Sequence, residues 1–348
     1  MPLMPPPSSP ASLLWRLVPA VLLLCGCAAL SESRAPAMMK AVRIHEYGGP
    51  EVLRYESAPR PSPQPDEVLI RVHAAGVNPV DAAVRQGYMR TALFHTLPLT
   101  LGWDVAGVVE QVGAHVTRFK PGDAVFALSD LRRGGAYAEY IALPEKEVVP
   151  RPRTLDAVHA AAVPLTGLTA WQALVEHAQL GPGQTVLIHG GSGGVGTMAI
   201  QLAKARGARV IATGSAHNLE YLESLGADEV IDYRATRFED VVKEVDVVLD
   251  PIAGDTMERS WQVLKKGGIL VSLLDSSAPQ KAQAHGVRGA WFLVRPEAEQ
   301  LTELAQLIDA GKIRVVVSQV LPLQEIRRAQ ELIQGKHTRG KLVLRVTE

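Results

Sequence analysis

A glycine-rich turn between an apolar segment and a helical segment places the strongest constraint on the fold of this chain. Its G-x-G-x-x-G pattern is formed by Gly191, Ser192, Gly193, Gly194, Val195 and Gly196. The first glycine permits a tight turn, the second lets a pyrophosphate approach the backbone, and the third lets the helix pack closely on the preceding strand. The pattern predicts a dinucleotide site at the N-terminus of this helix, where unpaired amide groups bind the anion.

The segment around this turn alternates short apolar strands with helices. The run at 185–189 is almost continuously apolar, as a parallel strand buried on both faces requires. Further strands are predicted over 209–213, 230–231, 246–249 and 269–273, and helices over 195–206 and 219–225. This alternation forms βαβ units and a parallel sheet. We therefore predict an α/β fold class, with a doubly wound parallel-sheet domain of the Rossmann type.

The flanking segments have a different pattern. From residue 39 to about 143, short strands that alternate polar and apolar residues are separated by glycine and proline, which predicts an irregular β-rich lobe. After residue 291, helices are predicted over 296–310 and 324–334, and strands over 315–317 and 341–346. The α/β block is therefore predicted as an insertion in the β-rich domain. The predicted division is a leader at 1–38, the β-rich domain at 39–163, the dinucleotide-binding domain at 164–290, and a return to the β-rich domain at 291–348.

Charge and cysteine content exclude several classes of function. Lysine and arginine total 36, as do aspartate and glutamate, so the formal charge is zero. A nucleic-acid partner is therefore not expected, because it requires a large cationic field. The two cysteines, Cys25 and Cys27, both precede residue 38. The remaining chain therefore has no disulfide framework and no thiolate metal ligand.

The leader admits two interpretations. Its uncharged run at 17–30 has fourteen residues, too few for a helix that spans a bilayer, which needs ~20. The run suits the apolar core of an export signal, and the segment 24–27 resembles a lipoprotein cleavage box that would leave a lipid anchor on Cys27. The alternative is a translation start at Met38 or Met39. A cytoplasmic protein is the favoured expectation because the cytosol supplies the dinucleotide; membrane association is expected only if the lipoprotein signal is processed.

The choice of dinucleotide is read ~20 residues beyond the first glycine, at the end of the second strand. An NAD-dependent enzyme has an acidic residue there, which holds the ribose hydroxyls. The segment 213–218 contains no acidic residue, whereas Ser215 and Asn218 can donate hydrogen bonds to a 2′-phosphate. NADPH is therefore the expected cofactor. This turn contains no lysine or arginine, and Arg234 is only a candidate for the charge partner of the phosphate.

Several motifs together carry a resemblance to a known family. They are 74–81 (AAGVNPVD), 102–109 (GWDVAGVV), the glycine-rich turn, 226–228 (GAD) with 232–234 (DYR), and 339–344 (RGKLVL). Over residues 39–346 the chain resembles the zinc-independent medium-chain dehydrogenase/reductases, in particular the NADPH quinone oxidoreductases. The resemblance implies a GroES-like catalytic domain for the β-rich lobe, a Rossmann domain and a homodimer.

The resemblance also implies a reaction. Zinc-dependent relatives place a cysteine where this chain has Asn78, and a glycine-histidine-glutamate where it has Gly102, Trp103 and Asp104. Asparagine and tryptophan are not zinc ligands, and the comparison therefore implies that this chain binds no metal. Alcohol oxidation uses the metal to stabilise an alkoxide, whereas a quinone or a conjugated enone accepts hydride without a Lewis acid. The expected reaction is hydride transfer from NADPH to a quinone or to the β-carbon of an α,β-unsaturated carbonyl.

Individual site residues follow from the same resemblance. Asn78 is expected to be catalytic and to contact the nicotinamide ribose, and Thr166 or Thr169 to meet the phosphates or the nicotinamide. Tyr88 is the second catalytic candidate, as a proton donor to the enolate, or else an aromatic residue of a lid. Packing or capping is the alternative role of the two threonines and of Tyr233. The remaining cofactor-binding candidates are Ser215, Asn218, Tyr233, Ile252, Ala253, Phe292 and Val294.

Two other functions stay open at this stage. One is an enoyl-thioester reductase, with Arg85, Arg90, Arg132 and Arg133 as candidates at the mouth of a pantetheine channel. The other is a non-catalytic NADPH-binding protein. The loops at 88–99 and 129–135 determine the substrate, and the sequence does not define their shapes.

Overall fold

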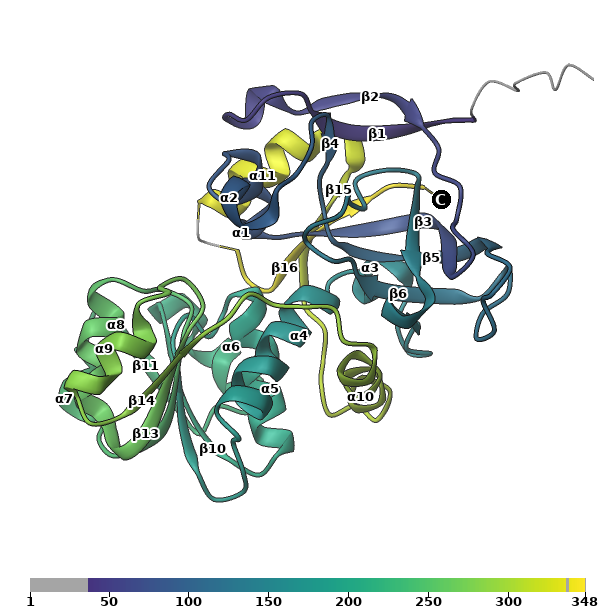
Figure 1. The fold of residues 1–348 in the computed structure, drawn as a ribbon. Coiled ribbons are helices and arrows are strands. Elements are labelled where there is room, and N and C mark those ends of the chain that lie inside the picture. The colour runs from purple at the N-terminus through teal and green to yellow at the C-terminus, as the bar shows by residue number, and fades with distance from the viewer. Residues whose placement is uncertain (1–36, 336–337, 348) are drawn as a thin grey trace, which may run out of the picture. The chain divides into compact units, whose positions relative to one another are not determined.

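The computed structural model describes residues 37–335 and 338–347, and Figure 1 shows how their helices and strands are arranged. A seven-stranded, mostly antiparallel sheet has the order β15-β16-β3-β5-β6-β8, with β7 paired to β3. Its members are β3 (Glu67–Val77), β5 (Asp104–Val112), β6 (Ala124–Leu128), β7 (Tyr140–Pro144), β8 (Val148–Pro150), β15 (Val317–Pro322) and β16 (Lys341–Arg345). The last strand β16 lies antiparallel to β3, with Leu342 opposite Val77. The C-terminal segment therefore joins a sheet that begins near the start of the described chain.

A second sheet of three antiparallel strands contains the first strand. Its order is β2-β1-β4, with β1 at Met38–Ile44, β2 at Arg54–Pro59 and β4 at Leu99–Thr100. Met38 lies in β1 opposite Pro59, so the strand begins at the last residue assigned to the leader. The export signal predicted within residues 1–36, including Cys27, lies outside the described residues.

The third sheet is parallel and has six strands. Its order is β11-β10-β9-β12-β13-β14, and each neighbouring pair is parallel. The strands are β9 (Thr185–Ile188), β10 (Arg209–Gly214), β11 (Glu229–Asp232), β12 (Val245–Asp250), β13 (Leu264–Ser272) and β14 (Arg288–Trp291). Winding starts at β9, proceeds to one edge and resumes at β12 toward the other, which creates a topological switch point between β9 and β12. This is the doubly wound sheet that the sequence predicts.

Helices cover both faces of the parallel sheet. In Figure 1, α4, α5 and α6 lie on one side of it, and α7, α8 and α9 lie on the other. These helices are α4 (Pro164–Trp171), α5 (Gly194–Ala205), α6 (Leu219–Ser224), α7 (Phe238–Val241), α8 (Asp255–Ser260) and α9 (Ala278–Ala284). The remaining helices are α1 (Pro79–Arg85), α2 (Arg90–Leu93), α3 (Ala157–Ala160), α10 (Ala298–Asp309) and α11 (Ile326–Gln334).

The helical run Ala157–His177 connects the two main sheets. It contains α3, α4 and a π-helical turn, η3 (Gln172–His177). The run is apolar and long enough to cross a membrane, but 83% of its apolar window is buried inside the protein. It therefore serves as a core helix, and α4 packs on both α5 and α10.

The bounds of some strands depend on pairing rather than on the local sequence pattern. Strand β3 extends as far as Val77 because its second half pairs with both β5 and β16. A strand is present near the predicted 315–317, but the predicted bounds are wrong: β15 runs from Val317 to Pro322. Its half-exposed alternation suits an edge strand better than a continuous apolar run does. Strand β14 has no strand-like sequence pattern and forms by pairing with β13.

Candidate active site

Most of the predicted cofactor-binding residues lie together at the carboxyl ends of the parallel strands. The glycine-rich turn follows β9, Ser215 and Asn218 follow β10, Ile252 and Ala253 follow β12, and Phe292 and Val294 follow β14. These loops leave the carboxyl ends of the strands, on both sides of the switch point. In open α/β sheets this crevice is where ligands bind.

The glycines of the turn are required by close contacts with neighbouring backbone and side chains. A Cβ atom on Gly196 would lie 2.4 Å from the carbonyl oxygen of Gly190, and one on Gly191 would lie 2.9 Å from Leu222 Cδ2. A Cβ on Gly194 would meet Lys341 Cδ and Thr166 Cγ2 at 3.0 Å. One side of the turn is therefore tightly packed against its neighbours, as a helix held closely against its strand requires.

The other side of the turn, which is accessible to solvent, offers backbone N–H donors. Helix α5 begins after Gly193, and no side chain caps its N-terminus, so the amides of its first turn have no intrahelical acceptor. Residues 192–195 are only partly buried, and a Cβ on Gly193 would have the Gly190 oxygen, at 3.4 Å, as its nearest contact. The turn thus combines free amides, a positive helix dipole and access from solvent, which fits the pyrophosphate of a dinucleotide.

The predicted adenosine side is an ordered polar cluster. Asn218 Nδ2 donates to Ser192 Oγ and to Ser215 Oγ, each at 3.2 Å, so the two loops after β9 and β10 are joined. Tyr233 lies next to them: its amide donates to the Gly214 carbonyl at 3.1 Å, and its side chain is 53% exposed. The guanidinium carbon of Arg234 lies 5.7 Å from the centre of the Tyr233 ring.

The side chain of Arg339, in the C-terminal segment, contacts this cluster, and the sequence analysis did not predict it. Arg339 Nε donates to Asn218 Oδ1 at 3.0 Å, and Nη2 donates to the His217 carbonyl at 3.1 Å. Its guanidinium also lies 4.7 Å from the centre of the Tyr221 ring. A guanidinium has five N–H groups, so this arginine keeps donors for a phosphate while its position is fixed.

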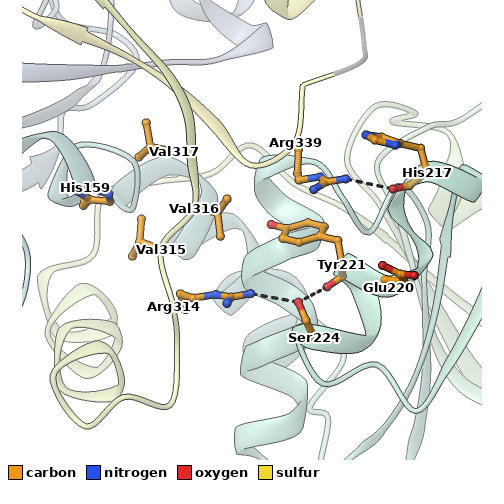
Figure 2. Close-up of a pocket in the computed structure, with 10 residues that line it drawn as sticks. All are labelled: His159, His217, Glu220, Tyr221, Ser224, Arg314, Val315, Val316, Val317 and Arg339. Carbon is orange, nitrogen blue, oxygen red and sulfur yellow. Dashed lines mark hydrogen bonds between the residues drawn. The ribbon is translucent and has the colours of Figure 1, made fainter.

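A neighbouring hollow of about 620 Å³ contains a second arginine (Figure 2). Arg314 Nη2 donates to Ser224 Oγ at 3.2 Å, and Tyr221 separates Arg314 from Arg339 in the view. The Tyr221 hydroxyl lies 3.2 Å from Thr197 Oγ1 on α5. Burial raises the pKa of Tyr221, so its ring stays neutral beside the two cations.

The loop after β12 is anchored by Asp250. Its carboxylate accepts the amide of Ile252 at 2.9 Å and that of Ala253 at 3.1 Å. Burial raises the pKa of Asp250, which these two amides counteract. Ile252 is half exposed, and its Cδ1 would lie 3.3 Å from a Cβ on Gly190. In the segment after β14, Phe292 stacks on His177, with ring centres 4.7 Å apart, and Val294 is partly buried.

Asn78 lies in a buried ionic cluster beneath the glycine-rich turn. Its Nδ2 donates to Asp104 Oδ2 at 2.8 Å, and its Oδ1 accepts from the Lys341 ammonium. The ammonium also donates to Asp104 Oδ2 at 3.1 Å and to the Val77 carbonyl at 2.9 Å. Asp104 Oδ1 accepts the Leu165 amide at 2.6 Å, which joins the cluster to α4.

A second buried carboxyl lies next to this cluster. Asp81 Oδ2 accepts the Asn78 amide at 2.7 Å and the Tyr137 hydroxyl at 2.5 Å, so Asn78 and Asp81 cap the start of α1. Asp81 Oδ1 is buried and has no hydrogen-bond partner among the described residues. Burial raises the pKa of Asp81 to about 7, against the opposing effects of Tyr137, the Asn78 amide and Lys341.

The other predicted site residues are placed less directly. The Thr166 hydroxyl donates to the Ala162 carbonyl at 3.0 Å, and the Thr169 hydroxyl donates to the Leu165 carbonyl at 2.6 Å. Both hydroxyls therefore donate to backbone carbonyls four residues earlier in the helical run Ala157–His177 and keep only acceptor capacity. Thr166 also packs under Gly194 through its methyl group. Tyr88 follows α1 and is 76% exposed, and its hydroxyl has no hydrogen bond among the described residues.

The arginines predicted for a pantetheine channel divide into two groups. Arg85 is fully buried and donates to Gln330 and to the Gly48 carbonyl, so its placement at a channel mouth is wrong. Arg133 is paired with Glu67 at 2.5 Å. Arg90 and Arg132 are exposed, and Arg132 lines a hollow of about 400 Å³ together with Phe94 and His95.

The positions that hold zinc in zinc-dependent relatives do not form a donor set here. Across residues 37–335 and 338–347, no three histidine, cysteine, aspartate or glutamate side chains converge as metal ligands. Asp104, the one carboxylate at these positions, is already paired with the Lys341 ammonium, which occupies the space a cation would need. These residues do not fit a catalytic zinc ion.

Two family models match the chain. The model described as "Alcohol dehydrogenase GroES-like domain" matches residues 64–153, and the one described as "Zinc-binding dehydrogenase" matches residues 225–344. The mouse protein named "NAD(P)H oxidoreductase RTN4IP1, mitochondrial" is 37% identical, covering 90% of this chain and 91% of its own. The "NADPH-dependent alkenal/one oxidoreductase, chloroplastic" of Arabidopsis thaliana is also 37% identical, covering 90% and 81%.

A solved structure gives the same result. The quinone oxidoreductase from Coxiella burnetii superposes with a TM-score of 0.85 at 36% identity, covering 89% of this chain and all of that one. The chain belongs to the medium-chain dehydrogenase/reductase family. It combines the GroES-like and Rossmann domains of that family. Its relatives include quinone and alkenal/one oxidoreductases. The chain is therefore an oxidoreductase with a site for a nicotinamide dinucleotide.

Proposed function

We propose that this medium-chain reductase transfers hydride from NADPH to a quinone or to the β-carbon of an α,β-unsaturated carbonyl, without a metal ion. The observation that carries the proposal is the position of the Asn78 cluster directly beneath the dinucleotide turn. Lys341 spans the two, since its Cδ would lie 3.0 Å from a Cβ on Gly194 and its ammonium contacts Asn78. NADPH supplies the hydride when bound, and the protein supplies position and a dry site.

The preference for NADPH rests on the charge at the adenosine side. Ser215, Asn218 and Tyr233 are neutral, and the nearest charged side chain bonded to them is Arg339. A guanidinium held this way favours a 2′-phosphate and gives a ribose diol no comparable partner. The name of the Arabidopsis relative, an NADPH-dependent oxidoreductase, favours the same cofactor.

The support for proposing metal independence is the donor set, whereas the description of one matching family model refers to zinc. Asn78 and Trp103 replace two ligand types, and Lys341 already neutralises Asp104. A quinone or conjugated carbonyl requires no Lewis acid to accept hydride, so the donor set and the proposed acceptors agree. Asn78 is the residue proposed to contact the nicotinamide ribose and the reacting groups. The exposed Tyr88 is the candidate proton donor, and water is the alternative source.

The test is NADPH consumption by the full chain with three acceptors: benzoquinone, a straight-chain enal and crotonyl thioester. Turnover of the quinone or the enal, faster with NADPH than with NADH, supports the proposal. Turnover of the thioester alone would assign an enoyl-thioester reductase. Binding of NADPH with no turnover of any acceptor would identify a non-catalytic binder and overturn the proposal.

We also propose a homodimer. The support is the free edge of the parallel sheet: β14 ends the strand order among the described residues, and Trp291 at its end is 40% exposed. An unpaired, partly apolar edge strand is a template for pairing with a second copy. Analytical ultracentrifugation of the native protein and of Trp291→Glu tests it: a native dimer that becomes a monomer in the variant is expected, and a native monomer would contradict it.

The proposed location is the cytoplasm, with anchoring by a lipid on Cys27 as the alternative. Its support is the cofactor, because NADPH is available in the cytosol. Intact mass of the native protein decides between the two. A chain that starts at Met38, Met39 or Lys40 supports the cytoplasm, and an acylated chain that starts at Cys27 supports the anchor.

A further inference from the structure

We propose that Lys341 is a positioning residue for the reaction: it fixes the orientation of the Asn78 side-chain amide beneath the cofactor. The inference rests on the proposed function, in which Asn78 contacts the nicotinamide ribose and the reacting groups. It adds a residue that lies in the C-terminal strand and that the sequence assigned no role.

The first step is the saturation of the ammonium group. Lys341 is 4% exposed and donates to three acceptors, namely the Val77 carbonyl, Asn78 Oδ1 and Asp104 Oδ2. An ammonium has three N–H groups, so none is left for a substrate or a phosphate. Lys341 therefore acts through its neighbours rather than by direct contact with the reacting atoms.

The second step is the orientation of the amide. The two ends of the Asn78 amide face opposite charges: Oδ1 faces the Lys341 ammonium, and Nδ2 faces the Asp104 carboxylate at 2.8 Å. A flipped amide would oppose N–H to ammonium and oxygen to carboxylate, and would exchange two charge-assisted hydrogen bonds for two repulsive contacts. One orientation is therefore imposed, with one Nδ2 hydrogen donated to Asp104 and the second left over.

The third step is the connection to the cofactor turn. The residue before Lys341, Gly340, donates its amide to the Ser192 carbonyl at 2.8 Å. The residue before that, Arg339, holds Asn218 at the adenosine side. Three consecutive residues thus contact the adenosine cluster, the glycine-rich turn and the Asn78 amide. The amide is held in register with the site where the dinucleotide binds.

A direct test of the orientation uses the scarcity of asparagine. The chain contains two asparagines, Asn78 and Asn218, so selective ¹⁵N-asparagine labelling gives two side-chain amide pairs without the cofactor. In Lys341→Met the Asn78 pair is expected to shift and to exchange its protons with water faster, while the Asn218 pair is unchanged. Arg339→Gln is the matched control and is expected to move the Asn218 pair only. An unchanged Asn78 pair in Lys341→Met would overturn the proposal.

The kinetic test separates positioning from a merely structural ion pair. Lys341→Met is expected to lower kcat about 10- to 100-fold, as small misplacements of reacting groups do, with the NADPH dissociation constant changed less than about 3-fold. In an Asn78→Ala background the same change is expected to have almost no effect on kcat, because the amide that it orients is gone. Additive effects in the double variant would refute a role through Asn78.

Two further comparisons keep the test decisive. If Lys341→Met fails to fold because Asp104 is left unpaired, the double variant Lys341→Met with Asp104→Asn removes both charges. This double variant is expected to fold and to show the same loss of kcat. A kcat equal to that of the wild type would overturn the proposal. Wild-type turnover of the quinone and the enal is measured first. Its absence would refute the proposed function, whereas the ¹⁵N result still decides whether Lys341 orients the amide.

Discussion

The proposed preference for NADPH predicts that replacing Arg339 with glutamine leaves a protein that binds NADPH and NADH with little discrimination. The arginine is held by hydrogen bonds to Asn218 Oδ1 at 3.0 Å and to the His217 carbonyl at 3.1 Å, and by the face of Tyr221. Glutamine keeps a polar side chain of moderate length and removes the charge. The adenosine cluster of Ser192, Ser215 and Asn218 does not depend on that charge for its own hydrogen bonds.

The size of the effect follows from the kind of contact. A hydrogen bond to a charged group contributes about 1.5–3 kcal/mol, which corresponds to about a 10- to 150-fold rise in the NADPH dissociation constant. The constant for NADH is expected to change less than about 3-fold, because no phosphate is present to lose its partner. Arg339→Lys should fall between wild type and Arg339→Gln, since it keeps the charge but not the planar fork.

Fluorescence titration of both dinucleotides measures this selectivity without an acceptor substrate. Arg314→Gln is the matched control: Arg314 lies in the same hollow beyond Tyr221 and bonds Ser224 rather than Asn218 (Figure 2), so NADPH affinity should stay within about 3-fold. The selectivity of the wild type should also weaken as salt rises. A folded Arg339→Gln variant with an unchanged ratio of NADPH to NADH affinity would refute the assignment of Arg339.

Two predictions concern the fold around the site. Burial raises the pKa of Asp81 to about 7, above its ordinary value of 3.8, so folding favours the protonated acid. The free energy of unfolding should therefore fall by about 1.4 kcal/mol per pH unit as pH rises from 4 to 7 and stay level above pH 7. Asp81→Asn should remove this slope in urea unfolding between pH 5 and 8, and a parallel slope in both proteins would contradict the prediction. Gly193→Ala should keep the melting temperature but weaken NADPH binding, since Gly193 has φ −74° and its Cβ would come no closer than 3.4 Å to a neighbouring atom. Gly196→Ala should destabilise the fold because its Cβ would lie 2.4 Å from a backbone oxygen. Equal thermal stability of the two variants would show that the packing argument is wrong.

The sequence predicts the parts of this protein that depend on local patterns. Apolar strands such as 185–188 and the glycine-rich turn are encoded within a few residues, so the parallel sheet and the dinucleotide edge follow from them. Asn218 was predicted as a cofactor-binding residue in the same way, from the absence of an acidic residue after the second strand. The family resemblance then supplied Asn78, whose role no local pattern indicates.

The ionic partners of the site are not local. Arg339 meets Asn218 across 121 positions, and Lys341 meets Asn78 across 263. Both arginine and lysine stand in the motif at 339–344, so their presence was visible, but their contacts arise only when β16 pairs with β3 and the segment before it reaches the glycine-rich turn. Arg85 shows the converse: a charged residue next to a predicted site has an internal partner, Gln330, that the sequence places 245 positions away.

The most direct test of the central claim follows the hydrogen itself. NADPH carrying deuterium at the transferred position of the nicotinamide is incubated with the full chain, an enal and a strong chelator, and the product is examined by mass spectrometry and NMR. We predict deuterium at the β-carbon of the saturated aldehyde, at a rate that the chelator leaves unchanged. A product without the label, or a reaction that stops with the chelator and returns with zinc, would contradict the account.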